Sequence, residues 1–434
     1  MTDSELGRIV LSLFVLLCSA HLLGYVCVRL RQPRVVGEIV AGLLLGPSLL
    51  ARVAPTASHF IFSSGSLGAD KYGTIAGFIY SLGLLLLMFG SGAETRNLFC
   101  RQDRRYTAWL AGFGTGLPFV IALACAGFLP LNRLMGPAHQ RSSLILVVGI
   151  AVAVTSIPVI SRIFYDLKIL HTRFASIVLG VAVIEDIVLW AVLAIATALA
   201  ASGSLPQGVI AQHVGITLLY FVGGLTLGPA LLRRLSQSRW NILAEVSPVG
   251  YVIGVLFAYT AVAAALNVSL VFAAFLAGFG FSSGDSNFNE ALDSINKFSF
   301  AVFIPIYFAI VGFKIDLGTS FSGSMLVLFV VAGCALKIAA VTAGAKLAGF
   351  SNMDTINLSV ATNARGGPGI VLASVAFDAG IINAFFYTTL VLMALITSQA
   401  AGAWLEYVLR KGWPLLSAER TVGPQALGEA AQTD

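Results

Sequence analysis

Two adjacent acidic residues, Glu185 and Asp186, lie in the middle of an apolar run from about residue 174 to residue 200. A run of about 20 apolar residues spans the hydrocarbon core of a bilayer as a helix. A carboxylate at that depth is costly and rare, and it usually belongs to an ion or proton pathway. We therefore predict that the functional site lies at this pair.

The two carboxylates are expected to have different roles. Successive residues of a helix point about 100° apart, so Glu185 and Asp186 face different neighbours. One of them can join a structural ion pair while the other faces an aqueous cavity. A carboxylate removed from water favours its protonated form, whereas a bound cation favours its charged form. A proton and a metal cation would therefore compete for the same carboxylate.

Two basic residues, Lys337 and Arg365, are also predicted to lie at mid-membrane depth. Because arginine is always protonated in proteins, we expect Arg365 to neutralise Glu185, and we expect Lys337 to adjust the electrostatic field of the site. An alternative interpretation is that both acids serve only a structural salt-bridge network with these two cations.

The composition excludes a soluble protein. The chain has 434 residues, of which 58% are hydrophobic and 11% are charged, and its mean hydropathy is +0.91. A soluble domain carries about 25% charged residues. We therefore predict an all-α integral membrane protein with about 13 transmembrane helices. The five cysteines and five histidines are scattered, so neither a disulfide framework nor a metal-ligand spacing is predicted.

The basic residues cluster at alternate membrane ends instead of forming one surface. The net charge of +6 therefore does not indicate a nucleic-acid partner. The positive-inside bias predicts a multi-pass protein of the cell membrane with an outside N-terminus and a cytoplasmic C-terminus. The first apolar segment has no basic region or cleavage site before it, so we expect it to be retained as a helix.

Two of the predicted helices are interrupted. The fifth apolar segment, about residues 142–165, carries Pro158 shortly after Thr155 and Ser156. Proline removes a backbone donor and glycine loosens a helix, so the chain can unwind at such positions. The polar groups freed there include hydroxyl and carbonyl oxygens, which are hard ligands for a cation.

The twelfth segment, about residues 356–376, is interrupted in the same way by Asn363, Gly366, Gly367 and Pro368. Unwound backbone at membrane depth persists only inside protein or beside water. If the chain consists of two related halves, the two interruptions stand at equivalent places. Matched interrupted helices of this kind indicate inverted repeats with a transport site between them. A plainer explanation is that glycine and proline are common in membrane helices.

At this point the sequence resembles the monovalent cation/proton antiporter superfamily. It is most similar to the branch of bacterial Na⁺(K⁺)/H⁺ antiporters and the membrane parts of Kef-type potassium efflux systems. The resemblance covers nearly the whole chain, and its order and spacing of motifs are specific. The motifs are VVGEIVAGLLLGPSLL, FGSGAET, TSIPVISRIFYDLKIL followed by VLGVAVIEDIVLW, VFAAFLAGFGFS, FIPIYFAIVGFKIDL and ATNARGGPGIVLASVAFDAGIIN.

The resemblance implies roles for the residues singled out above. Asp186 matches the essential ion-binding aspartate of the family, and Glu185 matches the variable position before it. Thr155 and Ser156 match the polar break beside the ion. Arg365 matches a basic position on the second broken helix. Lys337 likewise matches a basic position on the eleventh helix.

The resemblance also implies two inverted repeats, crossed broken helices five and twelve, and a core domain that moves against a dimerisation domain. We assign about residues 74–200 and 297–407 to the core. About residues 1–50 and 208–283 are assigned to the dimerisation domain, and 408–434 to a short cytoplasmic tail. We expect a homodimer surrounded by lipid, with no cytoplasmic nucleotide-binding domain in this chain.

The resulting hypothesis is a secondary antiporter that exchanges Na⁺ or K⁺ for H⁺ by alternating access. It needs no cofactor beyond the transported ions, with Asp186 as the residue that binds the monovalent cation. Alternatives are a Na⁺-coupled organic-solute carrier on the same architecture, a cation channel, or a transporter-derived sensor. An intramembrane enzyme is not expected, because adjacent acids on one helix cannot face each other across a substrate.

Overall fold

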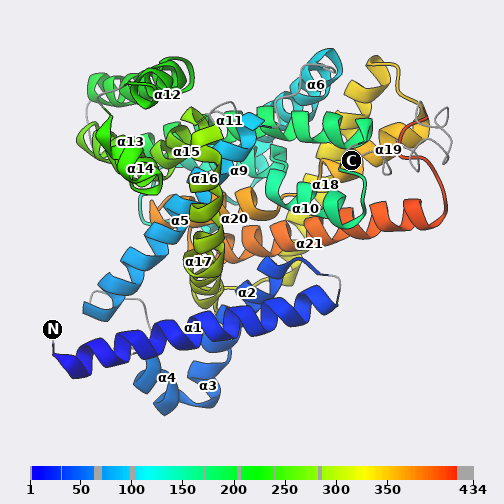
Figure 1. The fold of residues 1–434 in the computed structure, drawn as a ribbon. Helices are drawn as coiled ribbons and strands as arrows, with labels where there is room; N and C mark the ends of the chain where they lie inside the picture. The colour runs from blue at the N-terminus through cyan, green and yellow to red at the C-terminus, as the bar shows by residue number, and fades with distance from the viewer. Residues whose placement is uncertain are drawn as a thin grey trace.

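The chain folds as a bundle of helices (Figure 1). The computed structural model describes residues 2–30, 32–62, 71–97, 104–170, 172–202, 207–238, 241–281 and 286–417. Within these ranges the only strand-like pairing is one isolated bridge, between Met135 and Ile382. The predicted all-α class is confirmed. Most of the predicted cytoplasmic tail, residues 418–434, lies outside the described residues.

Ten stretches of helix in the described ranges are long and apolar enough to cross a membrane. These stretches are built from α1 (Asp3–Arg29), α2 (Arg34–Leu45) with α3 (Leu50–Val53), α5 (Lys71–Asn97), α6 (Arg104–Ala111) with η1 (Gly112–Gly116), α7 (Leu117–Cys125) and η2 (Ala126–Phe128), α11 (Arg173–Ala201), α12 (Gln207–Ser236), α14 (Pro248–Ala265), α16 (Ser286–Ala301) with α17 (Phe303–Phe313), α18 (Gly323–Leu347) and α21 (Ala384–Arg410). The connecting helices are α4 (Pro55–Phe62), α8 (Leu131–Leu134) and α13 (Ile242–Val246).

The remaining predicted segments are shorter or interrupted helices. The ninth, predicted at about residues 269–283, is α15 (Leu270–Gly280). The fifth is divided into α9 (Arg141–Ala153) and α10 (Ile157–Asp166). The twelfth is divided into α19 (Asn352–Ala361) and α20 (Gly366–Asp378). Both interruptions therefore occur in the predicted segments.

Helices α2 and α17 pack with their backbones in contact. A Cβ atom on Gly42 would lie 1.6 Å from the carbonyl oxygen of Ala309, and a Cβ on Gly312 would lie 1.9 Å from the carbonyl oxygen of Ile39. Neither glycine can carry a side chain at this separation. Small residues allow such close approach in membrane bundles, where dispersion contacts hold helices together.

Helices α5 and α15 repeat the same arrangement. A Cβ on Gly92 would lie 2.0 Å from the carbonyl oxygen of Phe275, and a Cβ on Gly278 would lie 1.9 Å from that of Phe89. In both pairs the glycine of each helix follows the contacted carbonyl of that helix by three residues. The second predicted segment, about residues 35–50, thus packs on the tenth, about residues 297–313. The third, about residues 74–94, packs on the ninth, and this exchange of partners is expected of two related halves.

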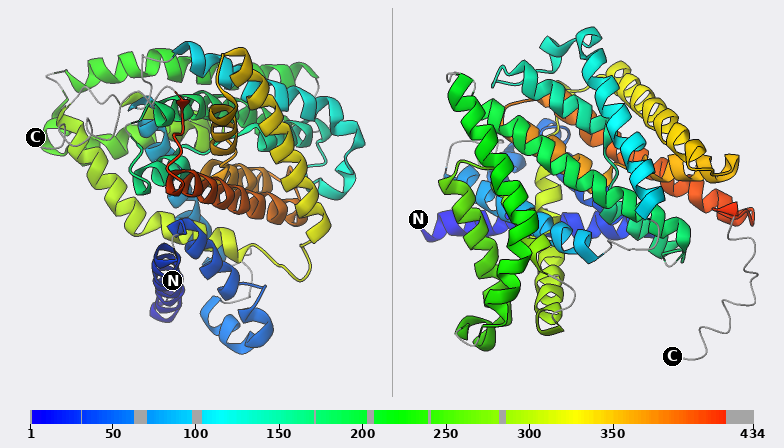
Figure 2. Two further views of the ribbon diagram at one scale, coloured as in Figure 1. Left: turned by 90° about the vertical axis from the view of Figure 1, so that its right-hand side faces the viewer. Right: turned by 90° about the horizontal axis from the view of Figure 1, so that it is seen from above.

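Helix α20 lies inside the bundle beside α21, and its residues from Gly366 to Ala376 are all buried (Figures 1 and 2). After α21 the chain turns back onto α19. The backbone N–H of Ser417 donates to Asp354 Oδ1 at 2.7 Å, and Asn357 Nδ2 donates to the carbonyl of Leu415 at 3.1 Å. Leu415 and Ser417 of the predicted tail are therefore packed against the second interrupted helix.

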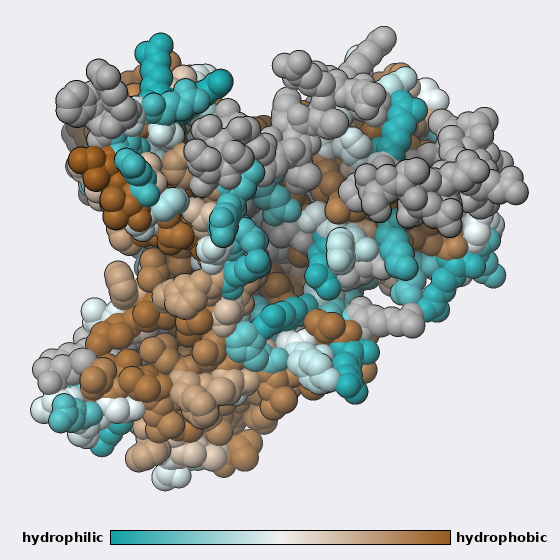
Figure 3. All heavy atoms as spheres, in the orientation of Figure 1, coloured by the Kyte–Doolittle hydropathy of each residue, from teal (hydrophilic) through white to brown (hydrophobic). Residues whose placement is uncertain are grey.

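Apolar side chains gather over the lower part of the face drawn in Figure 3, where α1 and α17 lie in Figure 1. On α1 the exposed large apolar residues include Leu6, Val10, Phe14 and Leu22. An exposed apolar surface of this extent suits contact with lipid tails or with another membrane-embedded chain.

Candidate functional site

The two interrupted helices meet at their breaks. The backbone N–H of Ser156 donates to the carbonyl of Ala364 at 2.6 Å, and the hydroxyl of Thr155 donates to the carbonyl of Thr362. Both donors come from the first break and both acceptors from the second. All these groups are buried. The breaks therefore satisfy part of each other's backbone hydrogen bonding, which a membrane interior requires.

Local sequence explains why each second half-helix restarts where it does. Ser156 caps α10, because its hydroxyl accepts a hydrogen bond from the backbone N–H of Val159 at 3.4 Å. Pro158 stands in the first turn of α10, where a missing N–H costs nothing.

The second break depends on glycine at its closest point. Gly366 has a φ of +31°, and a Cβ there would lie 2.7 Å from Ser156 Oγ. Its backbone N–H donates to Ser398 Oγ at 2.9 Å. Gly367 and Pro368 follow in the buried first turn of α20. A larger residue at position 366 would push the two breaks apart.

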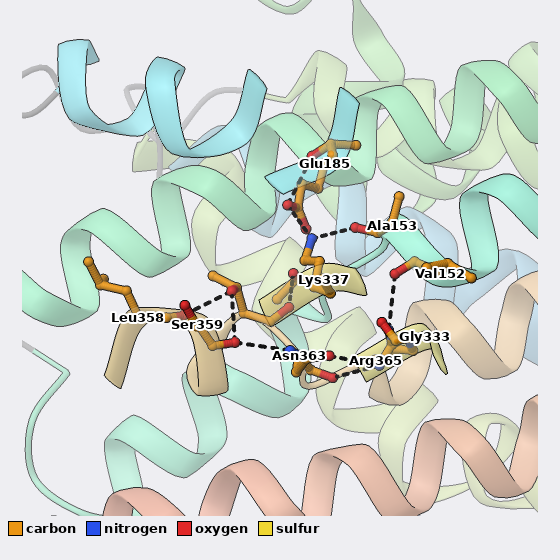
Figure 4. Close-up of polar contacts among 12 residues, drawn as sticks. Val152, Ala153, Glu185, Gly333, Lys337, Leu358, Ser359, Asn363 and Arg365 are labelled. Atoms are coloured by element: carbon orange, nitrogen blue, oxygen red, sulfur yellow. Dashed lines mark hydrogen bonds and ion pairs between the residues drawn. The ribbon is translucent and has the colours of Figure 1, made fainter. Parts of the chain in front are cut away.

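Arg365 does not pair with Glu185, and this prediction is wrong. Its guanidinium donates to the carbonyls of Ala151 at 3.1 Å, Val152 at 3.0 Å and Gly333 at 3.1 Å (Figure 4). The last carbonyls of a helix have no partners within it. Those of Ala151 and Val152 are in the last turn of α9, which ends at Ala153 inside the bundle. The five N–H donors of arginine can be shared among several carbonyls, so the guanidinium is hydrogen-bonded here without a carboxylate.

Asn363 is tied to the same network. Its Oδ1 accepts from Arg365 Nη1 at 3.1 Å, and its Nδ2 donates to the carbonyl of Ser359 at 3.0 Å. Both ends of this amide are therefore engaged. The side chain braces the second break instead of presenting a free oxygen.

Lys337 is the residue that pairs with Glu185. Its Nζ lies 2.6 Å from Glu185 Oε1, and neither side chain is exposed. The same ammonium donates to the carbonyl of Ala153, the last residue of α9. Figure 4 shows the two charged side chains pointing toward each other from α18 and α11. Glu185 thus has the structural ion pair expected of one of the two acids, but with the other cation.

Thr115 is a member of this site that was not predicted. Its hydroxyl donates to Glu185 Oε1 at 2.9 Å, and the residue is 4% exposed. It stands on η1, a π-helical turn between α6 and α7. Such turns are rare and often occur at functional sites.

Asp186 is fully buried, and neither of its carboxylate oxygens accepts a hydrogen bond from any residue within the described ranges. Its helix, α11, packs against α9, α10, α19 and α20, which are the four half-helices of the crossing. Buried polar atoms are nearly always partnered, so each exception needs an explanation. A buried carboxylate of this kind requires a proton or a cation to balance its charge.

The charges of the site balance in a particular way. Glu185 is matched by Lys337, and the positive charge of Arg365 is directed at helix-end carbonyls. Asp186 is the acid left over. Across the described ranges no three histidine, cysteine, aspartate or glutamate side chains form a cluster that could hold a metal ion. The described part of the site therefore contains one buried carboxylate, that of Asp186, to which no side chain donates a hydrogen bond.

An all-helical membrane bundle in which two interrupted helices cross beside a buried carboxylate has the architecture of a secondary transporter. The comparison with protein families agrees. The family model described as "Sodium/hydrogen exchanger, transmembrane" matches residues 13–411, and the chain belongs to this family.

Individual relatives support the same membership. The chain is 25% identical over 429 residues to Cation/H(+) antiporter 17 of Arabidopsis thaliana, covering 96% of this chain and 50% of that protein. It is 27% identical over 411 residues to the Na(+)/H(+) antiporter NhaS4 of Synechocystis sp., covering 92% and 96%. The chain spans about half the length of the Arabidopsis relatives that it matches.

The fold is also similar to a solved structure. It matches that of the sodium proton antiporter MjNhaP1 from Methanocaldococcus jannaschii with a TM-score of 0.65 at 15% sequence identity. The match covers 93% of this chain and 98% of that one. The two chains therefore share an architecture over nearly their whole lengths.

Proposed function

We propose that this chain is a secondary antiporter of the cell membrane that exchanges Na⁺ or K⁺ for H⁺ by alternating access. The observation that carries the proposal is Asp186, a buried carboxylate without a hydrogen-bond donor among the described residues, beside two crossed helix breaks. Membership of the sodium/hydrogen exchanger family supports it.

Asp186 is proposed to bind a proton and a cation in turn. In the protonated form the acid is neutral and can remain buried. When the site opens to water of low proton concentration, the proton leaves and the carboxylate attracts a cation. The hydroxyls of Thr155 and Ser156 keep lone pairs that can complete the coordination, because a hydroxyl has two acceptor positions and can donate as well.

The neighbouring ion pair is proposed to set the field in which this exchange occurs. Glu185 and Lys337 compensate each other, so the net charge near Asp186 changes when either of them gains or loses a proton. Arg365 keeps its charge and holds the end of α9 in place. Its role is then to keep the break open rather than to bind the ion.

The glycine contacts indicate where the boundary lies between the core and the dimerisation domain. The α2–α17 and α5–α15 pairs are interlocked through backbone, so neither pair can slide without separating. By contrast, α17 meets α20 through polar side chains, with Lys314 Nζ 2.7 Å from Asp378 Oδ1 and Tyr307 Oη 3.2 Å from Ser374 Oγ. We therefore propose a boundary that differs from the one assigned from the sequence: α5 and α17 move with the dimerisation domain, and the core begins at α6 and at α18.

A thiol cross-linking experiment tests this division. Lys314→Cys with Asp378→Cys, joined by a bifunctional reagent, should stop exchange because it ties α17 to α20. Arg52→Cys with Asp316→Cys replaces a partly exposed pair between α3 and the residues after α17; joined in the same way, it should leave exchange intact. Equal inhibition by both cross-links would reject the proposed boundary.

The proposed homodimer and orientation have separate tests. A second copy could cover the exposed apolar surfaces described above, and native mass spectrometry from mild detergent should then give a mass of two chains. The outside N-terminus predicts that a cysteine placed at Ser4 reacts with an impermeant thiol reagent in intact cells. One placed at Gly412 should react only after the cells are opened.

The transport activity is tested in proteoliposomes that contain a pH-sensitive dye. Addition of Na⁺, K⁺ or Li⁺, with the membrane potential clamped, should drive protons across the membrane in the opposite direction to the cation. A solute carrier would instead show cation uptake only with an organic substrate, and a channel would give single-channel currents. Absence of proton movement with all three cations would contradict the proposal.

A further inference from the structure

We propose that Thr115 is a positioning residue for proton-coupled exchange, holding the carboxylate of Glu185 in the orientation from which the neighbouring ion pair acts on the transport site. This inference rests on the proposed antiport function. It adds to that function a residue on the fourth membrane segment, which is outside the crossing of the interrupted helices and outside the helix that carries the two acids.

The contacts at Glu185 are unequal between its two oxygens. Oε1 accepts from both Lys337 Nζ at 2.6 Å and Thr115 Oγ1 at 2.9 Å, whereas Oε2 accepts from no residue in the described part of the chain. The hydroxyl therefore shares one oxygen with the ammonium and fixes the rotation of the carboxylate. Oε2 is left without a hydrogen-bond donor among the described residues.

The backbone of η1 fits closely against the ion pair. A Cβ on Gly114 would lie 3.0 Å from Val341 Cγ2, 3.5 Å from Glu185 Oε1 and 3.9 Å from Lys337 Nζ. A Cβ on Gly344 of α18 would lie 2.8 Å from Phe113 Cβ. The π-helical turn and α18 are thus interlocked, which gives the Thr115 hydroxyl a fixed position relative to the side chain of Lys337.

The neutral hydroxyl of Thr115 can donate to Glu185 throughout the transport cycle, whereas the ammonium of Lys337 can lose its charge. If Lys337 loses its proton or moves away during the cycle, Glu185 loses its ionic partner in a buried place. The hydroxyl of Thr115 has no charge to lose, so it continues to donate to Oε1 and keeps the carboxylate oriented. Hydrogen bonds to a charged acceptor are about twice as strong as bonds between neutral groups, so this single donor is a substantial part of the stabilisation of Glu185.

The charged groups that act on Glu185 come from its own helix, from α18 and from the second break. Lys337 approaches from α18, and Arg365 at the second break also interacts electrostatically with Glu185. Asp186 is adjacent on α11 and interacts in turn with Glu94 of α5. Removing the Thr115 hydroxyl leaves all these charges in place. Any change in proton coupling would then report the hydroxyl itself.

The test is the pH profile of cation-dependent proton flux in proteoliposomes for Thr115→Val, which keeps the shape of the side chain but removes the hydroxyl. With one donor fewer, the carboxylate of Glu185 holds Lys337 and its proton more tightly. The pH of half-maximal exchange should then move about one unit in the alkaline direction, a tenfold change in proton affinity. Thr115→Ser, which keeps the hydroxyl, should restore the profile.

A matched control is Thr226→Val on α12. The Thr226 hydroxyl donates to the carbonyl of Val222 in its own helix at 2.6 Å, so the same atoms are deleted away from the ion pair. This variant should have the profile of the unmodified protein. If Thr115→Val does not fold, Thr115→Cys provides a weaker donor of similar size and should show a smaller shift in the same direction.

The outcomes separate the two proposals. If the unmodified protein exchanges ions and the Thr115→Val profile is unchanged or moves in the acid direction, the role of Thr115 is wrong and antiport stands. A profile for Thr115→Ser that matches Thr115→Val would also reject it, because the hydroxyl would then be irrelevant. If the unmodified protein shows no exchange, antiport itself fails.

Discussion

Lys337 Nζ and Glu185 Oε1 are 2.6 Å apart, and both side chains are fully buried in the middle of the bundle. The ion pair therefore joins α18 to α11 at the level of the first helix break, where Lys337 also donates to the carbonyl of Ala153. Removing one member of a buried ion pair is more damaging than removing both, because the remaining charge has no partner.

This relationship predicts a large loss of stability for Lys337→Met. The free energy of unfolding should fall by about 3–5 kcal/mol, the usual result of leaving a buried charge alone. Thermal unfolding in detergent, followed by fluorescence, would measure it. Lys346→Met is the matched control on the same helix, since Lys346 is exposed. Equal unfolding temperatures for the two variants would contradict a structural role for the pair.

Arg365→Lys should destabilise the protein although it conserves the charge. Lysine cannot reach the carbonyls of Ala151 and Val152 together, and each buried helix-end group left without a partner costs about 1–3 kcal/mol. Adding Glu185→Gln should not relieve the defect. If it did, Arg365 would be neutralising Glu185 after all, and the helix-end role described here would be wrong.

Gly42→Ala should disrupt the contact between α2 and α17. The new methyl group would meet the carbonyl of Ala309, at a separation of 1.6 Å unless the helices part. Overpacking of this kind costs about 1–3 kcal/mol or more. Gly77→Ala on α5 has no atom within 4 Å of the added methyl group, so its unfolding temperature should not fall. Tolerance of both substitutions would show that the interlock is not needed.

The loop between α17 and α18 predicts a specific loss of stability in acid. Partial burial raises the pKa of Asp316, but hydrogen bonds from Thr319 and Gly318 and the charge of Arg52 lower it by more, so the net pKa is below its ordinary value. A carboxyl whose pKa is lower in the folded state stabilises the fold above its unfolded pKa, near pH 4. This contribution disappears as the pH falls through the folded pKa.

Asp316→Asn should therefore lower the unfolding temperature slightly at pH 7 and flatten its decline below about pH 4. The effect should be small, because the side chains of Arg52 and Asp316 are 48% and 24% exposed and solvent screens them. Unfolding temperatures of both proteins across this pH range provide the measurement. Parallel curves for the two proteins would mean that Asp316 does not contribute.

The position of the site could be predicted from the sequence because it depends on local features. Two acids in an apolar run, and Pro158 and Gly366 in two others, are visible without any knowledge of packing. The structure places the two breaks in contact, with α11 beside them. The glycines that join α2 to α17 and α5 to α15 are visible in the sequence. Their contacts can be recognised only when it is known which helices meet.

The pairing of charges could not be predicted, because it depends on how each helix is rotated about its axis. Charge alone favours Arg365 as the partner of Glu185. The carbonyls at the end of α9 compete for the guanidinium, and their position is known only from the structure. Thr115 was missed for a related reason. The sequence GFGTG at positions 112–116 is rich in glycine, but it does not predict a π-helical turn. Such a turn shifts the helical register by one residue through the backbone, and the pattern of side chains does not indicate it.

If the carboxyl group of Asp186 carries the exchanged ion, Asp186→Asn should remove the group on which transport depends. In proteoliposomes with a pH-sensitive dye, this variant should fold and insert but lose cation-dependent proton flux. Asp316→Asn, the same substitution in a loop, should retain the flux. Exchange by Asp186→Asn at the rate of the unmodified protein would show that Asp186 does not carry the ion.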